Sequence, residues 1–236
     1  MKRLDVWVGG ALGLALLYAS WVGWAPFGLT PFGLTEALGF VTGALCVYLT
    51  VLENVWNFPV GIANSVFFLV LFAGARLYGD ASLQIIFIAL GFQGWYLWLR
   101  GGENRTPLHV ERASRLLLAG VGAFVVVGTA GLTLIFQYVH DSAPFLDAFT
   151  TILSLGAQYL LNRKAIENWL LWMAADVVQI YLYFYKELQL TAVLYLVFLG
   201  LCVAGLRSWL ETLSEQRRGG GSASPLVEAG GGAARG

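Results

Sequence analysis

Apolar segments long enough to cross a lipid bilayer follow one another along almost the whole chain. A membrane helix needs about 20 such residues, and lipid cannot hydrogen-bond an open backbone, so the segments must be helices or a closed barrel. Only 12% of the residues are charged, whereas soluble domains carry about 25%. We therefore predict an all-α integral membrane protein with about eight transmembrane helices. The spans run from residue 4 to near Trp24 and then over 35–53, 56–75, 82–100, 115–139, 145–161, 165–185 and 189–210.

The two ends of the chain differ in character. Lys2 and Arg3 precede the first span, a pattern that is also typical of a signal peptide. However, the span is longer than the roughly 7–15 apolar residues of such a peptide, and it lacks an obvious Ala-x-Ala site. We interpret residues 1–30 as an N-terminal transmembrane helix. Residues 211–236 are polar and then rich in Gly, Ala and Ser, so we expect a disordered cytoplasmic tail.

Basic residues are unevenly distributed over the predicted loops. With eight spans both termini lie on one side of the membrane, and only Arg76 and Lys186 fall on the other side. Because basic loops stay in the cytoplasm, both termini are expected to be cytoplasmic. The basic residues on that side are Lys2, Arg3, Arg100, Arg105, Arg112, Arg115, Arg163, Lys164, Arg207, Arg217, Arg218 and Arg235.

A repeat appears when the chain is shifted by 111 residues, since Asn57 then aligns with Asn168. Matches of Asn, Gly and Trp at one offset are more informative than matches among leucines. Each repeat holds three spans, over 35–100 and 145–210, and the single span at 115–139 links them. An odd linker leaves both repeats in the same orientation, as in transporters with parallel repeats. The matches pair Tyr48 with Tyr159, Asn57 with Asn168, Leu77 with Leu188, Ala81 with Ala192, Leu83 with Leu194, Phe87 with Phe198, Gly94 with Gly205 and Trp98 with Trp209.

Polar and aromatic residues share one face of the span at 165–185. They advance by three or four residues, which is the spacing of one helix face. A carboxylate inside a membrane helix costs about 2.5–3.5 kcal/mol on the insertion scale, so Asp176 indicates a functional site. The alternative is a hydrogen bond between helices that only stabilises the bundle. The face consists of Asn168, Trp172, Asp176, Gln179 and Tyr183, and Trp169, three residues before Trp172, flanks it.

A matching face in the first repeat comprises Asn57, Gly61, Asn64 and Phe68. Substrate sites in such transporters lie between the repeats near the bilayer midplane, so we expect both faces to line one polar cavity. Gln93, nine residues after Gln84, faces the opposite way on a regular helix and is assigned to packing. For each amide an interhelical hydrogen bond of about 1 kcal/mol is the alternative. The predicted substrate-binding residues are Asn57, Asn64, Gln84, Gln158, Asn168, Trp169, Trp172 and Asp176.

No pattern for catalysis, a metal or a cofactor is visible. The sequence has no zinc-type spacing, no phosphate-binding glycine loop and no nucleophile elbow. His109 and His140 fall in predicted loops without a cluster of partners, and Cys46 and Cys202 lie in apolar spans as packing residues. We therefore expect a non-enzymatic protein without a metal or cofactor.

Several motifs occur together in the two repeats. They are 56–64 (WNFPVGIAN), 77–80 (LYGD) with Leu83 and Gln84, 94–98 (GWYLW), 167–172 (ENWLLW) with Asp176, and Thr191 with Tyr195. As a set they resemble the PnuC family of nicotinamide riboside transporters, over about residues 36–210. The resemblance implies a fold similar to a full-length SWEET transporter, a homotrimer in the bacterial inner membrane, and energy-independent uptake of nicotinamide riboside. It also implies trapping by a cytoplasmic riboside kinase, with the Trp pair around the nicotinamide ring and amides at the ribose.

The first repeat departs from this pattern, because Phe58 and Gly61 stand where the second repeat has its two tryptophans. We therefore expect an asymmetric cavity. Related transporters of this type carry thiamine or riboflavin, so another vitamin is an alternative substrate. A proton-coupled transporter is a further alternative, with Asp176 as the carboxylate deep in a span.

Overall fold

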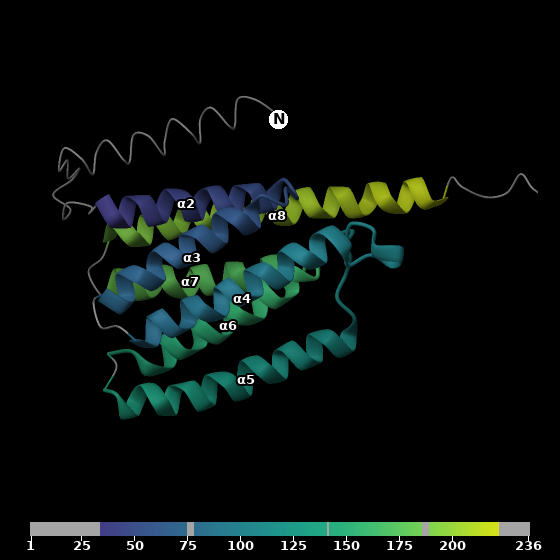
Figure 1. Cartoon of the computed structure of the whole chain (residues 1–236). Coiled ribbons are helices and arrows are strands. Elements are labelled where there is room, and N and C mark those ends of the chain that lie inside the picture. The colour runs from purple at the N-terminus through teal and green to yellow at the C-terminus, as the bar shows by residue number, and fades with distance from the viewer. Residues whose placement is uncertain (1–33, 75–77, 141, 186–188, 222–236) are drawn as a thin grey trace, which may run out of the picture.

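A computed structural model describes residues 34–74, 78–140, 142–185 and 189–221 (Figure 1). Each of the seven predicted spans after the first corresponds to an α-helix. The predicted N-terminal transmembrane helix and the tail beyond residue 221 lie outside the described residues. The helices are α2 (Leu34–Val51), α3 (Asn57–Gly74), α4 (Tyr78–Arg100), the short 3-10 helix η2 (Glu103–Arg105), α5 (Arg115–Tyr138), α6 (Pro144–Asn162), α7 (Asn168–Tyr185) and α8 (Gln189–Gly221).

Four of the described helices are long and apolar enough to cross a membrane. These segments are Asn57–Gly74, Ala81–Arg100, Arg115–Tyr138 and Tyr195–Arg218, and α2 contributes the shorter apolar segment Leu38–Val51. The helices α6 and α7 carry more polar residues, and many of their side chains are buried. They tolerate this polarity because it faces the interior of the bundle. The described part of the chain is therefore all-helical and typical of a multi-pass membrane protein.

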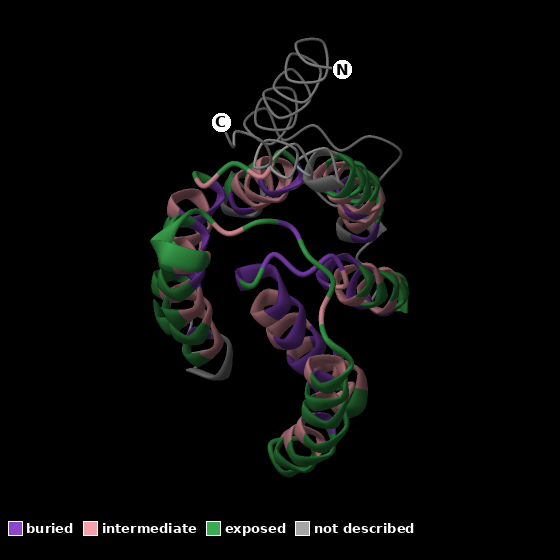
Figure 2. Cartoon of the chain, turned by 90° about the vertical axis from the view of Figure 1, so that its right-hand side faces the viewer, coloured by how far each residue is buried: buried purple, intermediate pink, exposed green. Residues whose placement is uncertain are grey.

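Six helices form a closed ring. The pairs in contact are α2 with α3, α3 with α4, α4 with α6, α6 with α7, α7 with α8, and α8 with α2. The remaining long helix, α5, packs against α6 outside this ring. Viewed end on, buried residues face the interior between the helices, and exposed residues cover the outer surfaces and much of α5 (Figure 2).

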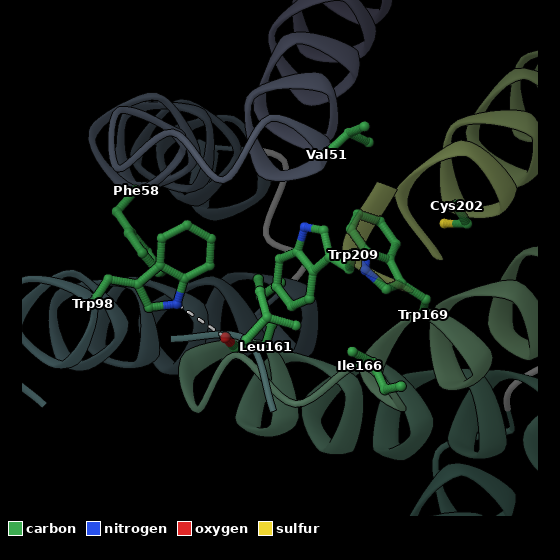
Figure 3. Close-up of a cluster of buried hydrophobic side chains, with 9 residues drawn as sticks. Val51, Phe58, Trp98, Leu161, Ile166, Trp169, Cys202 and Trp209 are labelled. Carbon is green, nitrogen blue, oxygen red and sulfur yellow. Dashed lines mark hydrogen bonds between the residues drawn. The ribbon is translucent and has the colours of Figure 1, made fainter. Parts of the chain in front are cut away.

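Aromatic side chains fill the ring where α2 and α6 end. The Trp98 indole Nε1 donates a hydrogen bond to the Leu161 carbonyl at 3.0 Å, and the Trp209 Nε1 donates to the Thr50 carbonyl at 3.1 Å. The Trp209 ring also packs edge-on against Trp169, with centroids 5.4 Å apart. Trp98, Leu161, Trp169 and Trp209 belong to one buried cluster (Figure 3). The cluster joins helices that are far apart in the sequence.

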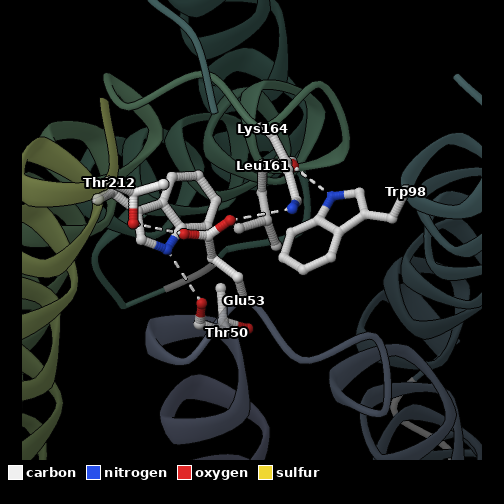
Figure 4. Close-up of polar contacts among 7 residues, drawn as sticks. Thr50, Glu53, Trp98, Leu161, Lys164 and Thr212 are labelled. Carbon is white, nitrogen blue, oxygen red and sulfur yellow. Dashed lines mark hydrogen bonds and ion pairs between the residues drawn. The ribbon is translucent and has the colours of Figure 1, made fainter. Parts of the chain in front are cut away.

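Two short turns lie at this same end, between α2 and α3 and between α6 and α7. Glu53 and Lys164 stand at matching places in them, with φ of 53° and 51°. Left-handed backbone is uncommon for residues other than glycine, so the same local geometry is built twice. The two side chains form an ion pair across the bundle (Figure 4).

The segment between η2 and α5 crosses the α6–α7 turn. Glu111 pairs through its backbone with both sides of Ala165, donating to the Lys164 carbonyl and accepting from the Ile166 amide. The Glu167 carboxylate accepts a hydrogen bond from the Ala113 amide at 2.9 Å. This segment therefore holds the residues that precede α7.

The last helix is longer than predicted. We expected its span to end at Leu210 and residues 211–236 to be disordered, but α8 continues to Gly221. Residues 211–218 include Glu, Leu, Gln and Arg, which have good helix propensity, and they extend a helix that is already nucleated. For residues 211–221 the expectation of disorder is therefore wrong.

Candidate functional site

A cavity of about 420 Å³ lies inside the ring of six helices. All six contribute to its lining, which includes Cys46 and Thr50 on α2, Asn57, Asn64 and Phe68 on α3, Gln84 and Phe87 on α4, Thr150, Ser154, Gln158 and Leu161 on α6, Trp169, Trp172, Asp176 and Gln179 on α7, and Tyr195, Phe198 and Cys202 on α8. Its volume falls in the roughly 300–1,000 Å³ range of sites for small molecules. The ring therefore encloses space for one small ligand.

Seven of the eight predicted binding residues line this cavity: Asn57, Asn64, Gln84, Gln158, Trp169, Trp172 and Asp176. Asn168 does not. Its side chain is fully buried, and its Nδ2 donates to the Ala165 carbonyl at 2.6 Å. It lies at the start of α7, where it ties the helix to the preceding turn.

The polar face of α7 is directed into the cavity over four positions. Trp169, Trp172, Asp176 and Gln179 line it, while Val177 is exposed on the outside of the bundle. This spacing of three, four and three residues is that of a single helix face. Tyr183, predicted on the same face, is not part of the lining.

The two tryptophans of α7 have different surroundings. Trp169 is only 1% exposed, and a Cβ added at Gly205 would collide with its ring. Its Nε1 has no hydrogen-bond partner among the described residues. Trp172 is half-buried, so more of its ring is open to the cavity. Trp172 is therefore the better placed of the two to contact a ligand with its face.

Asp176 is the one residue with a formal charge among the described residues that line the cavity. It is 6% exposed, and its Oδ2 accepts a hydrogen bond from the Cys202 thiol at 3.4 Å. No Lys, Arg or His lies in the described lining. The cavity is thus suited to a neutral or positively charged ligand, because a carboxylate without a cationic partner attracts positive charge.

The two glutamines of α4 are separated as predicted. Gln84 lines the cavity, while Gln93 is exposed and its Oε1 accepts from the Asn162 amide at 3.2 Å. Gln93 therefore makes a contact between α4 and α6 and is not part of the described lining, in line with its assignment.

Some lining residues were not predicted. Thr150 and Ser154 stand eight and four residues before Gln158 on α6, so their spacing was a usable signal for one polar face. Tyr195, Cys46 and Cys202 also line the cavity. The two cysteines were interpreted as packing residues, and nothing in their sequence context distinguishes the two roles.

Comparison with known proteins gives a consistent family. Residues 33–211 match the family model described as "Nicotinamide mononucleotide transporter". "Nicotinamide riboside transporter PnuC" of Escherichia coli (strain K12) is 27% identical over 207 residues, covering 77% of this chain and 87% of that protein. "Riboflavin/roseoflavin transporter RibM" of Streptomyces davaonensis is 25% identical over 179 residues, covering 74% and 84%.

A solved structure has a similar fold. The "Crystal structure of the Vitamin B3 transporter PnuC" superposes with a TM-score of 0.62 at 23% identity, covering 88% of this chain and 92% of that chain. At this identity the similarity concerns the fold alone.

Proposed function

The chain belongs to the nicotinamide mononucleotide transporter family, and on that premise we propose that it carries nicotinamide riboside into the cell by facilitated diffusion. It is a multi-pass membrane transporter, and its relatives are named as transporters rather than enzymes. The E. coli relative is named for nicotinamide riboside. Phosphorylation by a cytoplasmic riboside kinase would then trap the substrate and maintain its inward gradient.

The observation that carries this proposal is the charge of the cavity lining. Nicotinamide riboside has a fixed positive charge on its pyridinium ring, and the described lining has a carboxylate, Asp176, and no cationic side chain. Nicotinamide mononucleotide adds a phosphate of roughly −1.5 to −2 charge, which this lining would repel. The riboside is therefore favoured over the mononucleotide for which the family is named.

The lining residues suggest how the ligand is held. An indole face attracts a desolvated cation by about 2 kcal/mol, so Trp172, with Trp169 at its side, would border the pyridinium ring. Asp176 would balance the charge from one helical turn away. The amides Asn57, Asn64, Gln84 and Gln158 would take the ribose hydroxyls. Asn168, outside the lining, would act by holding the start of α7.

For the architecture we propose two parallel repeats, α2–α4 and α6–α8, linked by α5, with an additional N-terminal helix in residues 1–30. The ring contacts support this arrangement. In the proposed repeats α2 corresponds to α6, α3 to α7 and α4 to α8. The contact of α2 with α8 then corresponds to a contact of α6 with α4, and both contacts are present. Adding 111 to Thr50 and Trp98 likewise gives Leu161 and Trp209, so the two indole hydrogen bonds are equivalent.

Orientation and assembly follow from the same premises. The basic loops favour both termini in the cytoplasm of a bacterium. The turns that hold Glu53 and Lys164 would then lie on the cytoplasmic side of the membrane. Resemblance to the PnuC family implies a homotrimer. Exposed apolar residues such as Val126 and Val127 on α5 suit contact with lipid or with another subunit.

A calorimetric titration of the purified protein tests the substrate. We expect nicotinamide riboside to bind, and nicotinamide mononucleotide, thiamine and riboflavin to bind at least tenfold more weakly. The similarity to RibM makes riboflavin the informative competitor. Tighter binding of riboflavin or thiamine would replace the proposed substrate, and tight binding of the mononucleotide would refute the charge argument.

Sealed vesicles containing the purified protein test the mechanism. Uptake down a concentration gradient should equilibrate the substrate, and an imposed proton or sodium gradient should not change the final level. Accumulation of unmodified substrate above the external concentration, driven by either ion, would show a coupled transporter and rule out facilitated diffusion.

A further inference from the structure

The lining amide of Gln158 is held from behind by Asn162, a side chain with 0% exposure. Asn162 Nδ2 donates to the Leu90 carbonyl at 2.8 Å and to Gln93 Oε1 at 3.2 Å. Its Oδ1 accepts from Gln158 Nε2 at 3.0 Å. Asn162 itself does not line the cavity.

Only one orientation of the Asn162 and Gln158 amide groups satisfies these hydrogen bonds. A backbone carbonyl can only accept, so the Leu90 carbonyl requires the NH₂ group of Asn162 beside it. The Oδ1 of Asn162 must then face Gln158, and it accepts a hydrogen bond from the NH₂ group of Gln158. Gln158 Oε1 is left without a partner among the described residues, on a side chain that lines the cavity.

Asn64 shows the same arrangement on the first repeat. Its Nδ2 donates to the Gly39 carbonyl at 3.0 Å and to Thr42 Oγ1 at 2.6 Å. The Thr42 hydroxyl uses its own proton on the Leu38 carbonyl at 2.7 Å, so it can only accept from Asn64. The Oδ1 of Asn64 has no partner among the described residues, and Asn64 lines the cavity.

Asn57 is a third lining amide whose NH₂ group donates within the protein while its carbonyl oxygen has no partner among the described residues. Asn57 Nδ2 donates to Thr50 Oγ1 at 2.9 Å, and the Thr50 hydroxyl donates to the Cys46 carbonyl. Asn57 is 2% exposed, and its Oδ1 has no partner in the described part of the chain. A buried acceptor without a partner is costly, and a ligand that brings a donor would remove this cost.

We propose that Asn162 and Thr42 are positioning residues, which orient Gln158 and Asn64 so that the free carbonyl oxygen of each amide is available to the ligand. At these two places the cavity then favours hydroxyl donors over groups that can only accept. This inference rests on the proposed function for the identity of the ligand. The orientation of the amides does not depend on that identity.

Analogues of nicotinamide riboside test the idea on the unmodified protein. Fluorine in place of a ribose hydroxyl keeps the size and weak acceptor character but cannot donate. We expect at least one hydroxyl position where the fluoro and deoxy analogues lose affinity equally, by roughly three- to tenfold, as for one lost hydrogen bond. Fluoro analogues that bind like the parent at every position, while the deoxy analogues bind more weakly, would overturn the proposal.

A double-mutant cycle tests Asn162 itself. Asn162→Leu frees the Gln158 amide to rotate, so affinity should fall about threefold or more and the preference for hydroxyl over fluorine should narrow. In a Gln158→Met background the same change should have little further effect on affinity, because Asn162 acts through Gln158. Additive losses in the cycle, or an unchanged preference for hydroxyl in folded Asn162→Leu, would overturn the assignment.

Gln93→Leu is the matched control. It removes the other acceptor of Asn162 Nδ2 but leaves the Leu90 carbonyl, which is sufficient to orient the amide. Affinity and hydroxyl preference should stay as in the wild type, and loss of that preference would overturn the proposed orientation of the amides. If riboside does not bind, the proposed function fails, and the cycle is measured with whichever of thiamine or riboflavin binds.

Discussion

Glu53 and Lys164 stand 111 positions apart, and the Lys164 Nζ lies 3.1 Å from Glu53 Oε2. Each residue is thus the counterpart of the other in the proposed repeats. Two like charges at this distance would repel, so a charged pair at this place needs one acid and one base. The pair is reinforced on both sides, by Thr212 Oγ1 donating to Glu53 Oε1 at 2.8 Å and by the Trp98 ring 4.6 Å from Lys164 Nζ (Figure 4).

Breaking this ion pair should destabilise the protein, and exchanging its charges should restore part of the loss. The Lys164 and Glu53 side chains are 10% and 23% exposed, so the pair is intermediate between an exposed and a buried one. Breaking it should therefore cost more than the roughly 1 kcal/mol of an exposed pair and less than the roughly 3 kcal/mol or more of a buried pair. We expect Lys164→Met to lower the unfolding temperature in detergent clearly. Glu53→Lys with Lys164→Glu should lie between Lys164→Met and the wild type. A double variant that is no more stable than Lys164→Met would show that the charges do not interact.

A methyl group at Gly205 should disturb the packing of Trp169. A Cβ at this position would collide with the Trp169 ring, whereas a Cβ at Gly200 on the same helix meets nothing within 4 Å. We expect Gly205→Ala to cost about 1–3 kcal/mol of stability through overpacking. Gly200→Ala should be neutral or stabilising, because alanine favours the helix. Thermal unfolding of both variants in one detergent provides the comparison, and equal effects would contradict the packing argument.

The two tryptophans of α7 should respond differently to truncation. Trp169 is buried against Trp209, so Trp169→Ala should cost about 3–5 kcal/mol of stability. Trp172→Ala should instead weaken binding of nicotinamide riboside by a few kcal/mol through the lost cation–π contact. Trp172→Ala should also reduce the preference of the protein for the charged riboside over uncharged reduced nicotinamide riboside. Trp172→Phe should retain part of the affinity and part of that preference. Unchanged affinity in folded Trp172→Ala would place the ring site elsewhere.

Cysteine labelling should report the orientation in the membrane. Ser114 and Ser142 are both exposed and lie at opposite ends of α5. In a background where Cys46 and Cys202 are alanine, Ser114→Cys should react with an impermeant thiol reagent only from the cytoplasmic side. Ser142→Cys should react only from outside. The reverse pattern would overturn the assignment of both termini to the cytoplasm.

The amino-acid sequence by itself determined the class of the protein and much of its framework. Charge is so scarce, and the apolar segments are so long, that only membrane helices satisfy the backbone. Helix periodicity then placed Trp172 and Asp176 on one face, and both line the cavity. The 111-residue offset matched Gly205 with Gly94 and Trp209 with Trp98. In the structure, both Gly205 and Trp209 pack against the Trp169 ring.

Only the tertiary structure decided which polar residues reach the cavity and which hold others in place. Asn168 and Asp176 lie on the same helix face, but the preceding turn captures the Asn168 amide. Asn162 has no distinguishing feature in the sequence, and it matters because the Leu90 carbonyl, 72 positions away, orients its amide. The hydrogen bond between Asn162 and Leu90 depends on the distance and direction between atoms of different helices, and the one between Asn168 and Ala165 depends on the shape of the turn before α7. Periodicity describes the faces of one regular helix at a time, so it predicts neither contact.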